Sequence, residues 1–150
     1  MEPVARLRDG TEVAAWLFKA NPVVWDVVGA IRAGEPIDAW PMVDNYRVDL
    51  VHPGHPCVLW VTGGRNAPTT GVWGIGEVSS EPYVQPSSRN ESEQPWVGLD
   101  LDLLDAPVRL RELVADERFG RCEIVRAPRV SSPVALTADE FTAILDAWPE

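Results

Sequence analysis

The order of apolar and polar positions predicts short strands, with helices near the two ends of the chain. Residues 14–20, AAWLFKA, are apolar on both faces of an extended chain, so we expect a central strand there. The other predicted strands cover 57–63, 72–80 and 96–104, with short extended segments at 37–40 and 45–51. The last main strand alternates between apolar and polar residues and is therefore expected to be half-buried.

Two helices are predicted from apolar residues that recur with helical spacing. The first begins after Asn21, a suitable N-cap, and ends at Gly34. Its apolar stripe consists of Val24, Val27, Val28 and Ile31. The second covers 137–149, where Thr137 and Glu140 have the spacing of a capping box.

These elements indicate an α+β domain built around a small barrel of mixed strands. We expect the domain to cover residues 14–150, after a loose N-terminal leader at residues 1–13. Residues 81–95 are rich in polar residues and proline and are expected to form a long loop.

Composition adds expectations about the compartment. There is no apolar run long enough to cross a membrane, so no membrane association is expected. The first residues are charged and lack the apolar core of a secretory signal, which favours the cytoplasm. In that compartment Cys57 and Cys122 are expected to be reduced, with a disulfide between them as the alternative.

The charge is acidic and unevenly distributed. The net charge is −10, which argues against tight, non-specific binding of nucleic acid. Residues 106–133 nevertheless contain six arginines against four acids, and this segment could guide a nucleic-acid strand locally.

Metal and catalytic motifs are weak. His52, His55 and Cys57 could supply three zinc ligands, but no fourth ligand is evident. Asp100 and Asp102 alternate along the predicted strand 96–104, and Asp105 follows it; the three form either a solvated face or a cation site. No serine has the sequence context of a nucleophile, and no phosphate-binding loop is present. We therefore expect no metal and no cofactor.

The seven tryptophans are the most informative residue type. Five fit strand or helix patterns and are expected in the core: Trp16, Trp60, Trp73, Trp96 and Trp148. Trp25 lies outside the stripe of its helix, and Trp40 lies where a strand meets a loop. Indole rings at such corners are suitable platforms for stacking a planar ligand.

Five motifs in order resemble the EVE domain of the PUA-like superfamily. They are WLFKANP…WD, DAW…YR, PGHPCVLWVTG, GVWGIGEVSSEPY and the stretch from PWVGLDLDLL to LTADEFTAIL. The resemblance extends from about Ala14 to Trp148. It implies a pseudo-barrel of mixed strands flanked by α-helices. It also implies a non-catalytic pocket for a modified nucleobase, in DNA or RNA or as a free nucleoside, since related YTH domains read methylated adenine in RNA.

The same resemblance implies which residues form the pocket. Lys19, Ala20 and Asn21 would be at its rim, and Trp40 would stack on the base. Further implied residues are Thr62 and Gly63 on the floor, Tyr46 and Arg47 on the opposite wall or at a phosphate, and Trp25 and Tyr83 as second stacking faces. The chain departs from the family where His55 replaces an acid, and where residues 81–95 contain only Tyr83 as an aromatic residue and Arg89 as a basic one.

Two other functions remain open. The related ASCH domains include amidohydrolases that act on an acylated cytidine with Lys, Thr and Glu. Lys19 and Glu77 could supply two of these groups, but Pro22 is at the position of the threonine. Alternatively, the acidic segment 81–95 could bind a protein partner, whose nature the sequence does not specify.

Overall fold

The computed structural model describes residues 1–64, 66–86 and 93–149. Its strands are β1 (Ala5–Arg6), β2 (Glu12–Val13), β3 (Ala15–Ala20), β4 (Ala39–Pro41), β5 (Pro56–Val61), β6 (Gly71–Val78), β7 (Tyr83–Pro86), β8 (Glu93–Arg109) and β9 (Val134–Leu136). Its helices are α1 (Val27–Arg32), α2 (Leu110–Leu113), α3 (Glu123–Arg126), α4 (Ala138–Ala147) and the 3₁₀ helix η1 (Tyr46–Leu50).

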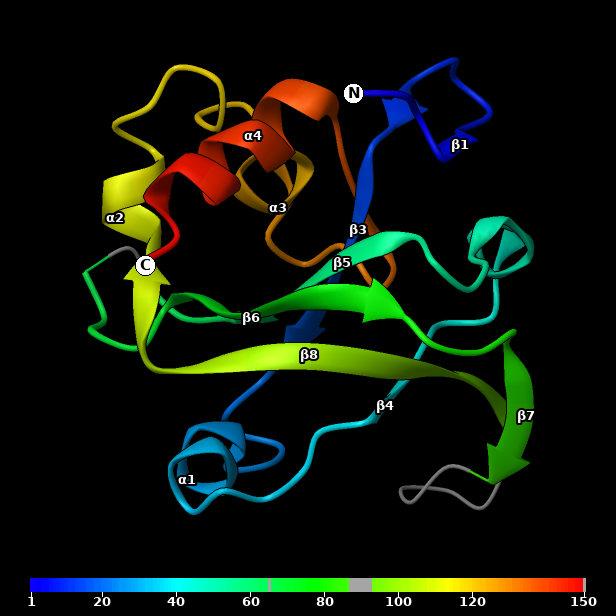
Figure 1. Ribbon diagram of the computed structural model, residues 1–150, viewed down its shortest axis with the longest axis horizontal. Helices are drawn as coiled ribbons and strands as arrows, with labels where there is room; N and C mark the ends of the chain where they lie inside the picture. Colours follow the sequence, from blue (N-terminus) through cyan, green and yellow to red (C-terminus); the bar gives the residue numbers. More distant parts are fainter. Residues whose placement is uncertain (65, 87–92, 150) are drawn as a thin grey trace.

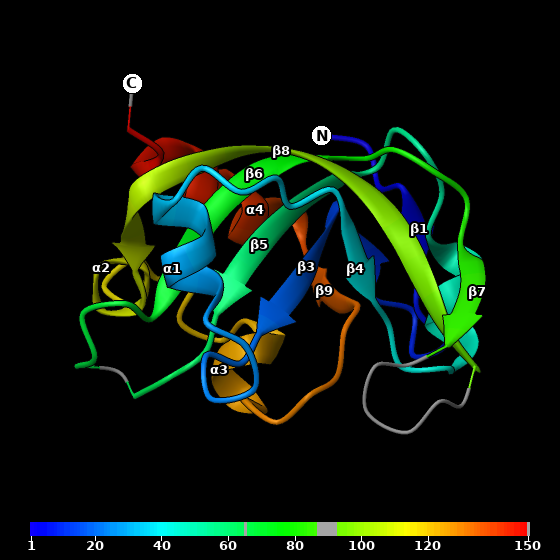
Figure 2. The same ribbon diagram turned by 90° about the horizontal axis from the view of Figure 1, so that it is seen from below.

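The main sheet has seven strands and is strongly curled (Figures 1 and 2). Its strand order is β4-β8-β6-β5-β3-β9, and β7 also pairs with β8. β3 and β5 are parallel, and the other pairs of this sheet are antiparallel. In Figure 1, α2, α3 and α4 lie on one side of the sheet and α1 on the other. The predicted α+β class and pseudo-barrel are therefore confirmed.

Apolar residues fill the space on both sides of this sheet. In the central strand β3, Trp16 and Phe18 belong to one buried cluster, whereas Leu17 belongs to a second cluster with Phe119 and Phe141. This alternation follows from the pleat of a strand, which directs successive side chains to opposite faces. It confirms the expectation that β3 is central and apolar on both faces.

Helix α1 begins later than the sequence indicates. Its N-cap is Asp26, whose side chain accepts a hydrogen bond from the backbone N–H of Gly29. The side chain of Asn21 instead accepts from the N–H of Val23, at 3.0 Å, and so closes a turn of its own. Val27, Val28 and Ile31 of the predicted stripe are buried, but Val24 precedes the helix and is exposed.

Two segments differ in type from the sequence prediction. Residues 45–51 were expected to be extended, but η1 forms there because Asn45 accepts a hydrogen bond from the N–H of Arg47. Residues 81–95 were expected to be a loop, but β7 and the start of β8 form a pair within this range. In both cases local or long-range hydrogen bonds decide the structure, and residue spacing does not report them.

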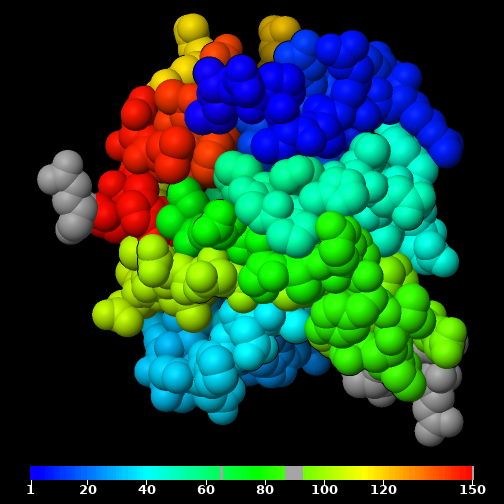
Figure 3. All heavy atoms as spheres, turned by 45° about the vertical axis from the view of Figure 1, so that its right-hand side comes forward, coloured from blue at the N-terminus to red at the C-terminus, as the bar shows by residue number. Residues whose placement is uncertain are grey.

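The N-terminal residues are packed, not loose. β1 and β2 form a two-stranded sheet, and the side chains of Leu7 and Val13 are buried in the core. Figure 3 shows these residues, in blue, resting against the segment that contains η1. Burial of these apolar side chains stabilises the packed position of the N-terminal segment.

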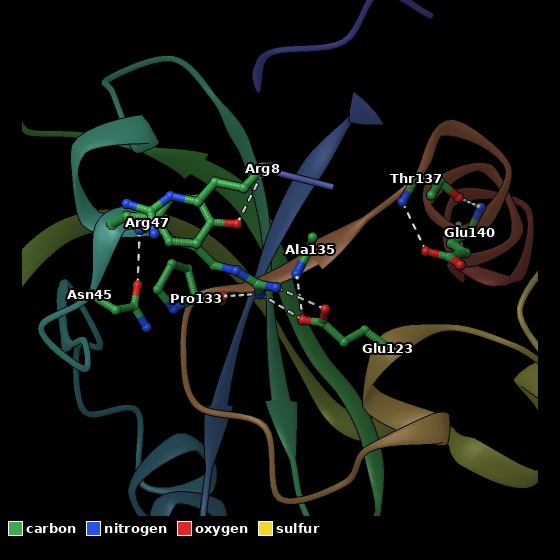
Figure 4. Close-up of polar contacts among 9 residues, drawn as sticks. Arg8, Asn45, Arg47, Glu123, Pro133, Ala135, Thr137 and Glu140 are labelled. Atoms are coloured by element: carbon green, nitrogen blue, oxygen red, sulfur yellow. Dashed lines mark hydrogen bonds and ion pairs between the residues drawn. The ribbon is translucent and has the colours of Figure 1, made fainter. Parts of the chain in front are cut away.

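The C-terminal helix matches its prediction. Thr137 caps α4, and the reciprocal hydrogen bonds with Glu140 form the expected capping box (Figure 4). Within the described residues, no helix has both the length and the apolar character needed to cross a membrane.

Candidate functional site

A pocket of about 590 Å³ opens beside the end of β3. Its walls come from the end of β3, the turn before α1, strand β4, the start of β8 and the loop that precedes β9. Figure 2 shows these elements converging at one side of the curled sheet. The volume is within the range typical of small-molecule sites.

Five of the predicted site residues line this pocket together: Lys19, Ala20, Asn21, Trp25 and Trp40. The first three are consecutive residues. Lys19 and Ala20 end β3, and the chain turns at Asn21. Trp25 comes from that turn, and Trp40 comes from β4, which lies on the far side of the sheet order. The curl of the sheet is what brings β3 and β4 close enough to share a pocket.

The two indoles touch each other on the pocket wall. Their ring centroids are 5.9 Å apart and their planes are inclined by 43°. A ring inserted between them would need about 7 Å, twice a carbon–carbon contact distance, so they do not form an open sandwich. Trp40 is 8% exposed, and its Nε1 donates to the backbone oxygen of Lys19, whereas Trp25 is 46% exposed. Trp40 is thus fixed, and Trp25 is the ring with freedom to adjust.

The hydrogen bond within the turn determines what Asn21 can offer a ligand. Its Oδ1 accepts from the N–H of Val23, at 3.0 Å. The Nδ2 amide group, which carries two N–H donors, forms no hydrogen bond with the other described residues. Asn21 can recognise a hydrogen-bond acceptor on a ligand.

Lys19 is partly withdrawn from solvent. Its Nζ donates to the backbone oxygen of Pro128, at 3.2 Å, and burial lowers the pKa of its ammonium group. Its backbone N–H donates to Oγ of Ser132, at 3.0 Å. Ser132 is itself buried and lines the pocket. Because its Oγ acts as the acceptor for Lys19, its hydroxyl hydrogen can still be donated to a ligand.

Other lining residues were missed by the sequence analysis. Gln94 lines the pocket and donates from Nε2 to the backbone oxygen of Met42, which leaves its Oε1 as an acceptor. Trp96 also lines the pocket, although it was expected in the core. The alternation of β8 could have indicated this position. Val97 and Leu99 face the core, and Trp96, one residue away from Val97, points to the opposite face of the strand.

Thr62 and Gly63 are next to the pocket residues but do not line the pocket. The backbone N–H and the hydroxyl of Thr62 both donate to the backbone oxygen of Ala20. A Cβ on Gly63, whose φ is 157°, would collide with the hydroxyl of Thr70, so its space is already occupied. These two residues support the end of β3 and do not form a floor.

Tyr46 and Arg47 are also outside the pocket lining. Figure 4 shows the side chain of Arg47 directed at Glu123. Arg47 forms two hydrogen bonds with the carboxylate of Glu123, at 2.6 and 2.9 Å, and one with the backbone oxygen of Pro133. Tyr46 accepts a hydrogen bond from the N–H of Arg8, whose guanidinium lies over the tyrosine ring. Both residues connect η1 to other segments, and neither is free for a ligand.

Tyr83 is on β7, opposite Trp96, and it does not line the pocket. Arg89 lies outside the described residues. His55 has a structural role. Its Nδ1 accepts a hydrogen bond from the buried indole Nε1 of Trp16, at 3.2 Å.

The ligand sets considered for a metal are not supported. Within the described ranges, no three His, Cys, Asp or Glu side chains are arranged to hold a metal ion. Cys57 is buried in the core, and His55 uses Nδ1 as the acceptor for Trp16.

Comparison with protein families gives a match to the EVE domain over residues 14–147. The chain belongs to the EVE domain family. Among solved structures, Rpa0253 from Rhodopseudomonas palustris has a similar fold, with 26% identity, coverage of 90% of this chain and 92% of that one, and a TM-score of 0.60.

Two other solved structures resemble the fold of this EVE domain. A protein from Pseudomonas putida has 16% identity, covers 89% of this chain and 99% of its own, and has a TM-score of 0.65. PSPTO5229 from Pseudomonas syringae has 19% identity, covers 89% and 98%, and has a TM-score of 0.58. None of the curated proteins compared with the chain matches it in sequence. Membership of the EVE family indicates a PUA-like binding module.

Proposed function

We propose that this EVE domain is a non-catalytic module that binds a modified nucleobase, either in DNA or RNA or as a free nucleoside. The observation that carries the proposal is the convergence of Trp25, Trp40 and Asn21 on one pocket of about 590 Å³. Asn21 and Trp25 come from the turn between β3 and α1, and Trp40 comes from β4. A flat heterocycle needs both an aromatic face and polar groups at its edge, and this pocket provides both.

The polar groups suggest how a base edge would be read. Nδ2 of Asn21 and the hydroxyl of Ser132 can donate, while Oε1 of Gln94 can accept. A base that presents acceptors and a donor in matching positions would leave none of these groups unpaired. An unpaired buried polar group costs about 1–3 kcal/mol, so this matching determines which base is accepted.

Stacking supplies much of the affinity. A base stacked on an aromatic side chain gains about 1–3 kcal/mol. A methyl group buried against the exposed ring of Trp25 adds about 0.8 kcal/mol, which corresponds to less than a tenfold preference. We therefore expect modest selectivity from a methyl group alone, and larger selectivity where the modification also changes a hydrogen bond.

A thermal-shift screen against a panel of modified nucleosides tests the proposal. A ligand at about one hundred times its dissociation constant should stabilise the fold by about 2.7 kcal/mol. For a domain of this size, this corresponds to an increase in Tm of roughly 5–10 °C.

Trp25→Ala is the test variant, because Trp25 lines the pocket and is 46% exposed, so its loss should spare the fold. Tyr83→Ala is the matched control, because Tyr83 is a 39% exposed aromatic residue outside the pocket. The proposal predicts that the shift is lost in the first variant and kept in the second. An equal shift in both variants, or no shift with any nucleoside or modified oligonucleotide, would overturn it.

The amidohydrolase alternative has weaker support. Lys19 is opposite Trp60 of β5, whereas Glu77 is opposite Pro56, at the other end of that strand. The offset of four residues corresponds to about 13 Å along a strand, in addition to the spacing between strands. Lys19 and Glu77 would therefore not reach the same substrate. Release of acetate from N4-acetylcytidine by the purified protein would overturn the proposal that the module is non-catalytic.

A further inference from the structure

A second hollow, of about 390 Å³, lies between the end of α1 and strand β8. Its apolar floor is formed by Ile31, Ile37 and Leu99, which are buried, and by the half-buried side chains of Leu101 and Leu103. We call it the β8 groove. It is separate from the nucleobase pocket, with which it shares no lining residue.

One edge of β8 is open along this groove. β4 pairs with β8 only from Trp96 to Gly98, and one more hydrogen bond joins the N–H of Leu99 to the backbone oxygen of Asp38. Beyond that point, no strand in the described part of the chain pairs with β8 on the side of β4. Figure 1 shows β8 extending well past β4, with α1 beside this edge.

The direction of the unpaired backbone groups follows from the ladder. Gly98 accepts from Ser79 on the side of β6 and β7, whereas Leu99 donates to Asp38 on the side of β4. Backbone groups alternate between the two edges of a strand, so those of Leu101 and Leu103 also face the side of β4. They form a short template to which another extended chain can add.

The rim of the groove is acidic. Glu35, Asp38, Asp100 and Asp105 line it, and none of them forms an ion pair with another described residue. The segments 33–38 and 99–105 contain five acids and no lysine or arginine. Their combined charge of −5 is half of the net charge of −10. The field at this groove therefore favours a cationic occupant and opposes a second copy of this acidic chain.

We propose that the β8 groove binds an extended, basic segment of a protein partner, in which lysine or arginine alternates with apolar residues. Such a segment would extend the sheet along the free edge of β8. Its apolar side chains would cover Leu101 and Leu103, and its cations would meet Asp100 and Asp105. The proposal does not depend on the function assigned to the other pocket.

A ten-residue capped peptide of alternating lysine and valine is a suitable probe. Its affinity is measured by fluorescence anisotropy at about 150 mM salt, where charges separated by more than about 8 Å are screened. The double variant Asp100→Lys/Asp105→Lys should weaken binding at least tenfold. The matched double variant Glu2→Lys/Glu117→Lys changes the net charge equally at remote, exposed positions and should weaken it less than twofold.

Two further measurements distinguish strand addition from charge attraction alone. In amide NMR spectra, the probe should shift the signals of Leu101 and Leu103, but not the indole signal of Trp25. Two further probes carry N-methyl groups on every second residue, one at the odd positions and one at the even positions. The probe whose methylated nitrogens face β8 should not bind, whereas the probe whose methylated nitrogens face away from β8 should still bind.

The proposal is overturned if both double variants lose affinity equally, if the two methylated probes bind alike, or if the signals of Leu101 and Leu103 do not move. It is also overturned if the wild-type protein does not bind the probe. In that case the acids serve only to keep other strands away from an open edge.

Discussion

Arg47 illustrates how a single side chain can be misread from sequence. Its position after Trp40 suggested a pocket wall or a phosphate contact, but its guanidinium is held by Glu123 and Pro133. The side chains of Arg47 and Glu123 are only 15% and 16% exposed. Burial raises the pKa of Glu123, but the hydrogen bonds and charge of Arg47 outweigh it, and the net result is a lowered pKa.

Removing this guanidinium should therefore affect stability and not binding. We expect Arg47→Met to lower the free energy of unfolding by about 1.5–3 kcal/mol, because a buried carboxylate loses charged hydrogen bonds. Urea denaturation measures this, and the exposed Arg111→Met is the control, with an expected change within about 0.5 kcal/mol. If Arg47→Met instead abolishes nucleoside binding at unchanged stability, its structural role is wrong.

His55 is a second residue with a structural role, because its Nδ1 accepts hydrogen bonds from the indole of Trp16 and from the backbone N–H of His52. Burial lowers its pKa from the ordinary value of 6.5, the charge of His52 adds to this, and Glu81 acts in the opposite direction. Nδ1 must be unprotonated to accept from the indole of Trp16. The folded state thus favours neutral His55 more than the unfolded state does.

The sign of the pH dependence follows from this difference. The unfolded chain binds the proton first as the pH falls below about 6.5, so the contribution of His55 to stability is present above that pH and is lost below it. Chemical denaturation between pH 7.5 and pH 5 should show the decrease. His55→Gln should flatten that part of the profile, whereas His52→Gln should retain it, and identical profiles for all three proteins would contradict the assignment.

Among the elements, those with a regular pattern were predictable. β3, β5, β6 and α4 appear within a few residues of the expected ranges, because their apolar periodicity and caps are local properties. η1 and β7 were not predicted, since η1 depends on the side chain of Asn45 and β7 depends on pairing with a distant part of β8. Local spacing contains no record of such partners.

The cap of α4 gives an element-scale prediction. Thr137→Ala removes the hydrogen bond to the N–H of Glu140 and should destabilise the fold by about 0.5–2 kcal/mol. Thr137→Ser keeps the hydroxyl and should cost much less. Thermal unfolding of the two variants tests this, and equal losses would indicate that the methyl group of the threonine matters more than its hydroxyl.

At the scale of the molecule, the sequence indicated the composition of the pocket better than its limits. Lys19, Asn21, Trp25 and Trp40 do meet, because β3 ends where the chain turns and the sheet curls β4 towards it. Gln94 and Ser132 complete the pocket, but they come from segments whose position depends on strand register, which composition cannot specify.

The two cysteines report whether the molecule unfolds as one unit. Cys57 and Cys122 belong to the two core clusters on opposite sides of the sheet. Burial, with a smaller effect of nearby acids, raises the pKa of each thiol to about 12, so the native protein should resist iodoacetamide.

In moderate urea, both thiols should be modified at the same rate if the clusters open together. Mass spectrometry of the modified peptides measures the two rates. Faster modification of Cys122 would show that the side covered by α3 and α4 opens separately.

The contact between Trp25 and Trp40 also provides an optical signal. Trp25 is the most exposed of the seven indoles, and its fluorescence should therefore dominate the long-wavelength edge of the emission spectrum and be quenched first by acrylamide. An occupant of the pocket would shield that ring and shift the emission towards the blue. Ligand binding can therefore be followed in the native, unlabelled protein by its intrinsic tryptophan fluorescence.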